Sequence, residues 1–284
     1  MIKFDKAIEK NFVYAIILLT SEYKEIIMIN VVVWNEFRHE KLKEKVRALY
    51  PNGLHATIKE FLDTDEELNV SLASLDEPEH GLPDEVLNNT DVLLWWGHAY
   101  HGEVSDELVE KIKNRVYIDG MGFIALHSAH HSKPFKAIVG TNGNLSWGRN
   151  QREIIWNILP SHPITKGIPD HFSLEREELY CEPFYIPQPD ELLFNGWYED
   201  GYVFRSGACF HRGMGKVFYF QPGHETCRSF YNVYVRQIIK NAVHWAAPSG
   251  VGYKATSGCP HILETAHETN LEYVEGAPEM IVID

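Results

Sequence analysis

The sequence predicts an α/β fold built on a mostly parallel central sheet, with some antiparallel strands in its second half. Three observations lead to this fold class. Apolar, β-branched runs of strand length alternate with helix-like segments through the first half of the chain. Strand-like runs separated by Gly or Pro follow in the second half, before one long amphipathic helix. The length of 284 residues and the apolar fraction of 44% suffice for one domain with a full core.

Strand and helix alternate in the first half of the chain. The strands are predicted at residues 29–34, 69–73, 91–96 and 123–126, and the helices at 40–50, 54–62, 84–88 and 105–115. Pro51-Asn-Gly53 separates the first two helices, and Ser105 is a typical N-cap for the fourth. Because strand, helix and strand follow one another in this order, right-handed crossovers and parallel pairing are expected.

Antiparallel pairs are expected after residue 133. A loop rich in Gly and Asn is predicted at 140–149, and an amphipathic helix that Pro248 ends is predicted at 230–247. The strands between them are predicted at 153–159, 192–198, 202–210 and 216–220. The chain is therefore predicted to form a single α/β domain at 28–248, with an extension outside the core at 1–27 and a tail at 249–284.

Composition narrows the classes of function. The net charge of −14 disfavours binding to nucleic acid or to an anionic membrane, and no basic run interleaved with aromatic residues offers a phosphate track. No apolar run approaches the roughly 20 residues that span a bilayer. The four cysteines have no CxxC spacing, so neither a disulfide framework nor a zinc ribbon is expected. We therefore expect a cytoplasmic protein.

Histidines follow three predicted strands at the point where each strand ends. They are His98, His127 and His224. In open α/β sheets, ligands bind outside the carboxyl ends of the strands, so these three loops are expected to converge. Neutral imidazoles from different strands are a common way to hold zinc or another first-row divalent metal. We predict that these three histidines bind a divalent metal, with zinc as the first choice, and that His101 or His130 is a fourth ligand or a support.

Other polar residues beside these loops are candidates for chemistry. Glu103 and Glu225 could orient an imidazole or act as a base. Lys133 could hold an oxygen-rich substrate, and Glu182 is a further acidic candidate. The predicted catalytic set is His127, Glu225, Glu182 and Lys133.

Plainer interpretations stay open. The histidines could decorate a surface loop, which is the stronger interpretation for His131. Ser128 could act as a nucleophile, although it lies one residue past the apex of the turn at His127 and no cysteine stands in that turn. Trp147, in the loop rich in Gly and Asn, is as consistent with a pocket wall as with core packing.

Six motifs follow one another between about residues 29 and 247. They are Val33-Trp-Asn-Glu36, Trp95-Trp-Gly-His98-Ala-Tyr-His101, Leu126-His-Ser-Ala-His130 with Ser132-Lys-Pro-Phe135, Ser161-His-Pro-Ile164, Tyr180-Cys-Glu-Pro-Phe184 and Pro222-Gly-His-Glu225. At these residues the chain resembles the ThuA-like family of trehalose utilization proteins, in the class I glutamine amidotransferase-like superfamily. The resemblance implies a flavodoxin-like three-layer sandwich. It also places His127 where true glutamine amidotransferases have their nucleophilic cysteine, so no Cys-dependent amidotransferase activity is expected.

The resemblance further implies a role in disaccharide catabolism, beside a sugar dehydrogenase of the same pathway that makes 3-keto-sugars. A metal held by the histidines could polarise a ketose carbonyl or activate water, so isomerisation or cleavage of a sugar or 3-keto-sugar is expected. The alternative is a non-catalytic sugar-binding or partner module that kept the fold and lost its nucleophile. The expected partner is a small sugar or keto-sugar, with no nucleic acid and no membrane, and a homo-oligomer stays open.

Overall fold

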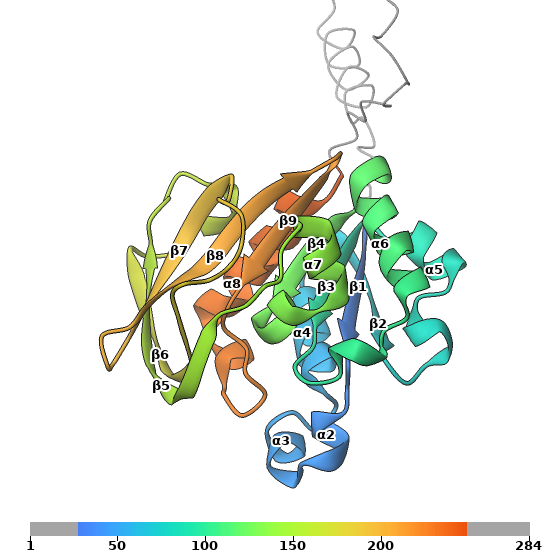
Figure 1. Ribbon diagram of the computed structural model, residues 1–284. Helices are drawn as coiled ribbons and strands as arrows, with labels where there is room; N and C mark the ends of the chain where they lie inside the picture. Colours follow the sequence, from blue (N-terminus) through green and yellow to red (C-terminus); the bar gives the residue numbers. More distant parts are fainter. Residues whose placement is uncertain (1–27, 249–284) are drawn as a thin grey trace, which may run out of the picture. The chain divides into compact units, whose positions relative to one another are not determined.

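The sheet of this protein has a parallel half and an antiparallel half. The computed structural model describes residues 28–248, so the predicted extension at 1–27 and tail at 249–284 lie outside the described residues. Within residues 28–248, nine strands form one sheet in the order β2-β1-β3-β4-β9-β8-β7-β5-β6 (Figure 1). The strands are β1 Ile29–Asn35, β2 Leu68–Ser74, β3 Val92–Trp96, β4 Gly122–Leu126, β5 Ser146–Asn157, β6 His171–Cys181, β7 Glu191–Tyr198, β8 Val203–Arg212 and β9 Gly215–Phe220.

Strands β2, β1, β3, β4 and β9 pair in parallel, which is the 2-1-3-4-5 order of flavodoxin-like folds. From β9 onward, the pairs with β8, β7, β5 and β6 are antiparallel. Strand β4 is buried along its whole length, as expected for a central parallel strand that is covered on both faces. The predicted α/β class, parallel first and antiparallel later, is confirmed.

Helices cover both faces of the parallel half (Figure 1). The α-helices in the described residues are α2 His39–Leu42, α3 Glu44–Leu49, α4 Leu54–Leu62, α5 Asp84–Asn88, α6 Asp106–Asp119, α7 Lys133–Val139 and α8 Val233–Ala246. Short 3₁₀ turns are η1 Pro78–Gly81, η2 His101–Glu103, η3 His127–His131, η4 Pro163–Thr165 and η5 Ser229–Tyr231. One core cluster joins the sheet to α4 and α8 through residues such as Ile58 and Ile238. The other joins it to α5, α6 and α7 through Leu87, Ile112 and Phe135. The three-layer sandwich is therefore present.

The predicted helix at 40–50 was wrong in one respect, because it breaks into α2 and α3 at Lys43, whose backbone is extended with φ −113° and ψ 110°. The break is explained by the hydrogen bonds that α2 makes through Glu40. Glu40 is buried and accepts hydrogen bonds from Asn35 Nδ2 at 2.7 Å and from the backbone N–H of Leu54 at 2.9 Å. These bonds fix α2 against the end of β1, and α3 then starts in a new direction.

Three elements of the second half were not predicted correctly. Strand β5 begins at Ser146, inside the predicted loop at 140–149, and β6 and α7 were not predicted. Strand β6 lies at the edge of the sheet and its residues 173–176 are mostly exposed and polar, so its composition is that of a loop. Helix α7 is short and depends on its N-cap, since Ser132 Oγ accepts a hydrogen bond from the N–H of Phe135 at 3.2 Å.

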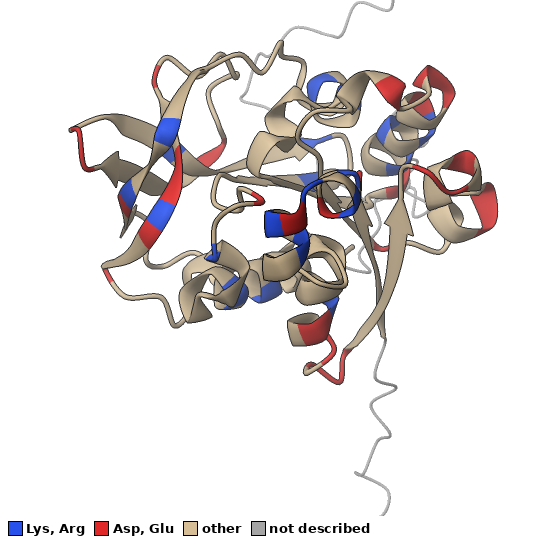
Figure 2. Ribbon diagram, turned by 90° about the horizontal axis from the view of Figure 1, so that it is seen from below, with Lys and Arg blue, Asp and Glu red and all other residues tan. Residues whose placement is uncertain are grey.

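The charged residues are distributed over many elements. Figure 2 shows Lys and Arg interspersed with Asp and Glu along the described ribbon. No helix among residues 28–248 is long and apolar enough to cross a bilayer.

Candidate metal centre

The three histidines that follow predicted strands lie together at the carboxyl edge of the parallel half. His98 follows β3, His127 follows β4 and His224 follows β9. The ring centroids are 5.6 Å apart for His98 and His127, 5.1 Å for His98 and His224, and 5.3 Å for His127 and His224. Because the ends of neighbouring parallel strands meet at one edge, three turns far apart in sequence place their imidazoles around one point.

A carboxylate that was not predicted from the sequence completes this group. Glu178 on β6 offers an oxygen that lies, with one ring nitrogen from each of the three histidines, in a set whose members are all within 4.8 Å of one another. The β5–β6 register shifts between Gln151 and Glu153, so the alternation of β6 changes there and Glu177, Glu178 and Leu179 are all buried. A pattern of period two could not identify which glutamate faces inward. We call His98, His127, Glu178 and His224 the four-residue centre.

His127 occupies the apex of a sharp turn and is held in one tautomer. Its φ of 54° lies in the left-handed region, which is unusual for a residue with a side chain and costs about 1–2 kcal/mol. Its Nδ1 donates to the backbone carbonyl of Gln221 at 3.0 Å. In a neutral imidazole the lone pair is therefore on Nε2, which lies 3.3 Å from Glu178 Oε2. A metal ligand needs this orientation.

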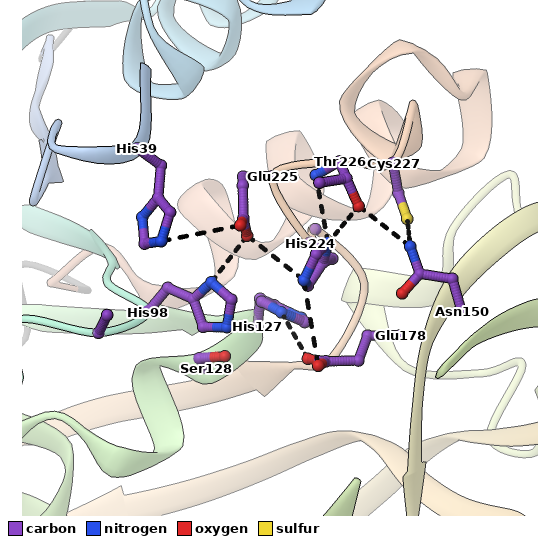
Figure 3. A network of polar contacts seen from close by, with 12 residues as sticks. His39, His98, His127, Ser128, Asn150, Glu178, His224, Glu225, Thr226 and Cys227 are labelled. Carbon is purple, nitrogen blue, oxygen red and sulfur yellow. Dashed lines mark hydrogen bonds and ion pairs between the residues drawn. The ribbon is translucent and has the colours of Figure 1, made fainter. Parts of the chain in front are cut away.

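His98 is oriented by Glu225, one of the predicted catalytic residues. Glu225 Oε2 lies 2.7 Å from His98 Nδ1 and 3.4 Å from His224 Nε2. Figure 3 shows Glu225 between His39, His98 and His224, with the second ring nitrogen of His98 facing His127. Because Glu225 is only 1% exposed, it acts on the imidazoles rather than on solvent. It orients them as the carboxylate in carboxylate–histidine–metal triads does.

His224 is oriented by Thr226. Its Nδ1 accepts a hydrogen bond from the backbone N–H of Thr226 at 3.2 Å and lies 2.7 Å from Thr226 Oγ1. Asn150 Nδ2 also donates to the same hydroxyl at 3.0 Å, as Figure 3 shows. The hydroxyl oxygen has two lone pairs, so it can accept from both Asn150 and the Nδ1–H of His224. In the structure Nδ1 accepts, so the proton of the neutral ring is on Nε2; the other tautomer, with Nδ1–H on the hydroxyl, is the one that a metal at Nε2 would require.

Two buried glutamates fix the loops that carry the histidines. Glu36, at the end of β1, accepts from the backbone N–H groups of His98 at 2.8 Å and of Ala99 and Tyr100 at 3.1 Å. Glu177 accepts in the same way from the N–H groups of Gly223 at 2.9 Å and His224 at 3.1 Å. Both side chains are almost fully buried. Each carboxylate therefore gathers the backbone of one histidine loop, which fixes where its imidazole lies.

The charges at the centre are balanced between imidazole and carboxylate. Burial lowers the pKa of His127, but the hydrogen bond to Glu178 and the negative charges of Glu178 and Glu177 together outweigh burial and raise that pKa. Burial raises the pKa of Glu178, but the same hydrogen bond and the charges of the surrounding imidazoles together outweigh burial and lower that pKa. Burial and the charge of His127 lower the pKa of His224 to about 4, which keeps this imidazole neutral at pH 7. A divalent metal would replace the proton that His127 Nε2 shares with Glu178, and a donor set of imidazoles and one anionic oxygen suits zinc and other first-row divalent metals.

A small cavity opens beside the centre. Its volume is about 180 Å³, and it is lined by His98, His101, Ser128, His130, His131, Leu145, Trp147, Glu178 and Tyr180. Ser128 Oγ and Tyr180 OH are 2.7 Å apart and both line it. Trp147 is 68% exposed, so it belongs to the wall and not to the core.

The structure does not bring every predicted residue to the centre. His101 and His130 line the cavity but are outside the four-residue centre, and His130 Nδ1 donates to the carbonyl of Gly143 at 2.6 Å. Lys133 Nζ donates to Val104 O and to Asp106 Oδ1, both at 2.7 Å, and so is engaged elsewhere.

The two other acidic candidates also form pairs away from the centre. Glu182 pairs with Arg205, with Nε 2.8 Å from Oε1. Glu103 pairs with Arg38 at 3.0 Å. Each of these carboxylates has a guanidinium partner, so of the predicted acids only Glu225 contacts the histidines.

Comparison with known proteins adds a family and a fold. The family model described as ThuA, trehalose utilisation, matches residues 30–246. No curated protein matches the chain. Among solved structures, a ThuA-like protein from Parabacteroides merdae ATCC 43184 is similar, with TM-score 0.58 and 15% identity over 78% of this chain and 91% of that one.

Two further structures show the same fold. A ThuA-like protein from Bacteroides uniformis ATCC 8492 has TM-score 0.54 and 16% identity over 76% of this chain and 90% of that one. A protein from Salmonella typhimurium LT2, described as cytoplasmic, has TM-score 0.52 and 11% identity over 77% of this chain and 100% of that one. At such low identity these structures support the arrangement of the elements alone.

Proposed function

This chain belongs to the ThuA, trehalose utilisation, family, and from that premise we propose that it is a metal-dependent enzyme acting on a sugar or 3-keto-sugar. The observation that carries the proposal is the four-residue centre, in which three imidazoles and one carboxylate converge at the carboxyl edge of the sheet. The tautomer of His127 and the carboxylate beside His98 supply the orientation that a metal requires. Zinc is the ion that we expect.

The ion, when bound, supplies a positive charge that polarises a carbonyl oxygen or makes a water molecule acidic. The residues of the chain do the rest. Burial raises the pKa of Tyr180 well above its usual range, so its hydroxyl keeps its proton at neutral pH. With Ser128 beside it, Tyr180 can donate a hydrogen bond to a substrate oxygen in the cavity. The exposed ring of Trp147 offers an apolar face at the cavity wall.

The proposal also includes a partner enzyme and a cellular location. A substrate that carries a keto group must be supplied by an oxidation, so a sugar dehydrogenase of the same pathway is the partner that we propose. A cytoplasmic location, where such a soluble partner would act, is part of the same proposal.

Metal content is the test. Protein purified without a nickel column should contain about one zinc or similar ion per chain, by analogy with other catalytic sites of this kind. His127→Ala should lose the ion, whereas His171→Ala, which removes an exposed histidine from the start of β6, should keep it. The loaded wild type should then convert a 3-keto-disaccharide, as followed by NMR, and His127→Ala should not.

Two outcomes would count against the enzyme. Metal-free wild type whose melting temperature does not respond to added zinc would contradict the metal centre. A loaded protein that binds sugars without turnover would support the non-catalytic sugar-binding module instead.

A further inference from the structure

A second cavity lies on the antiparallel half of the sheet. Its volume is about 450 Å³, and Trp156 on β5, Trp197 on β7 and Val203 on β8 are among its lining residues. Trp156 pairs with Asn195, and Trp197 pairs with Val203 in the neighbouring pair of strands. Since side chains alternate along a strand, Asn195 and Trp197 point to one face, and the residues paired with them point to the same face. We call this cavity the tryptophan groove.

The two indoles of the tryptophan groove are too exposed to be core residues. Trp156 is 40% exposed and Trp197 is 48% exposed. They stand one diagonal step apart on adjacent strands, a spacing of about 7–8 Å between backbones. Among the described residues, neither indole N–H has a hydrogen-bond partner. The groove therefore offers two apolar ring faces, each with an unused donor at its edge.

The wall of the groove is polar and rigid. Glu182 Oε1 accepts from Arg205 Nε at 2.8 Å and Oε2 accepts from Nη2 at 2.9 Å, which is a bidentate pair. Glu182 also accepts from the backbone N–H groups of Arg205 at 3.1 Å and of Phe184 at 2.6 Å, so its oxygens are well satisfied. In the described part of the chain, Arg205 Nη1 and the side-chain amide of Asn195 have no partner. The charges cancel inside the pair, and free donors remain at the rim.

We propose that the tryptophan groove binds a neutral carbohydrate. A pyranose has apolar faces that fit indole rings and a rim of hydroxyl oxygens that fit the free donors of Trp156, Trp197, Asn195 and Arg205. A charged ligand is disfavoured because the one ion pair of the wall is already neutralised. The volume falls in the range of small-molecule sites, about 300–1,000 Å³. A second copy of this chain fits less well, since nine residues line the groove and a stable interface uses about 20–30 residues a side.

This site is separate from the four-residue centre. None of the residues that line the groove lines the cavity beside the centre. The two are nevertheless joined through one segment, because β6 carries Glu178 and Glu182 follows its end at Cys181. Binding in the groove depends on no metal, so the proposal can hold or fail independently of the proposed enzyme activity.

The test is a titration of indole fluorescence and of heat with neutral sugars. Trehalose, maltotriose and cellotriose are added to EDTA-treated wild type and to His127→Ala, both of which lack the metal but keep the groove. We expect saturable binding of at least one sugar to both proteins. Trp197→Ala and Trp156→Ala should each weaken it by about tenfold or more, because each removes one of the two ring faces. Tyr185→Ala, which removes an exposed aromatic ring that lines neither the groove nor the cavity beside the centre, should not change it.

Three results would overturn the proposal. One is the absence of saturable binding of all three sugars to wild type. Another is binding that Trp147→Ala abolishes and the two groove variants leave intact, because it would place the sugar beside the centre. The third is a dimer, seen by sedimentation, that Trp197→Glu converts to monomer, because a second copy would then occupy the groove. Circular dichroism of each variant checks that it is folded.

Discussion

Two clusters of ligand-type side chains in this protein differ in one decisive respect. His162, Glu191 and Cys209 lie as close together as the four-residue centre, with one atom from each within 4.8 Å of the others. His162 Nδ1, however, accepts a hydrogen bond from the backbone N–H of Ile164 at 3.1 Å. Its proton is therefore on Nε2, and neither nitrogen has a free lone pair. Burial also raises the pKa of the Cys209 thiol well above its usual range, so this side chain is not a thiolate.

At the four-residue centre the partners of His127 and His98 have the opposite polarity, and His224 has a hydroxyl beside it that His162 lacks. His127 Nδ1 faces a carbonyl and His98 Nδ1 faces a carboxylate. His224 Nδ1 accepts from the backbone N–H of Thr226 but also faces a hydroxyl, which can accept in the other tautomer. An acceptor behind an imidazole leaves a lone pair in front of it, whereas a donor behind it removes that lone pair. Proximity of ligand types is therefore not enough to predict a metal site, and the group behind each ligand decides.

The largest expected effect is a loss of zinc affinity, and it should separate the carboxylates of the two clusters, Glu178 and Glu191. Glu178→Gln removes the anionic oxygen of the centre and should lower zinc affinity by more than about 100-fold, beyond the 10–100-fold typical of residues that only orient ligands. Glu191→Gln makes the same change in the other cluster and should leave the affinity unchanged. Competition with a zinc-binding dye measures both. The comparison would fail if Glu191→Gln were the variant that released the ion.

The next effect concerns the tautomer of His224. Thr226→Val removes the hydroxyl that can accept from Nδ1–H when Nε2 binds a metal, and leaves only the backbone N–H donor, so His224 should resemble His162. We expect zinc affinity to fall by about 10–100-fold with the fold intact. Thr226→Ser keeps the hydroxyl and serves as the control. Equal affinities for the valine and serine variants would show that the hydroxyl does not set the tautomer.

A third effect is on the pH dependence of stability, and it concerns a buried carboxylate that has no imidazole beside it. Glu153 is fully buried, accepts from Ser206 Oγ at 3.1 Å and has no imidazole beside it, so burial raises its pKa well above the usual range. The folded state then holds a proton that the unfolded state releases above pH about 4.3. Stability from this group is present below that pH and is lost as the pH rises toward the raised pKa, by up to about 1.4 kcal/mol per pH unit.

Glu153→Gln should remove this loss. Urea unfolding at pH 5 and pH 7 should show that the variant gains stability relative to wild type as the pH rises. If the difference in unfolding free energy between wild type and variant were the same at pH 5 and pH 7, Glu153 would be ionised in the folded state. The assignment of a proton to Glu153 would then be wrong.

The fold and the three histidines of the centre could be predicted from the sequence because each rests on a local pattern. Apolar runs of strand length mark β1, β3 and β4, and the change to polar residues after each run marks the edge where His98 and His127 lie. Glu178 could not be found in this way, since a bulge in β6 decides that it faces inward. The role of Glu36 was equally hidden, because its partners are backbone N–H groups about 60 residues away along the chain.

Lys133 and Glu182 show the converse limit of sequence reasoning. Their types and positions suited catalysis, yet each has a partner of opposite charge that only the tertiary structure reveals. Lys133 meets Asp106, and Glu182 meets Arg205. Residue type near a strand end therefore predicts which region is functional better than it predicts which side chain acts.

The smallest effect is expected from His162 itself. Its Nδ1 caps the 3₁₀ turn η4 by accepting from Ile164, so His162→Ala should lower the free energy of unfolding by about 1 kcal/mol, as the loss of other N-caps does. His162→Asn, which can cap the same N–H, should recover most of that stability. Zinc content should be the same in both variants as in wild type, because this histidine has no lone pair to offer. A variant at His162 that lost the ion would reverse the comparison and move the metal to the cluster of His162, Glu191 and Cys209.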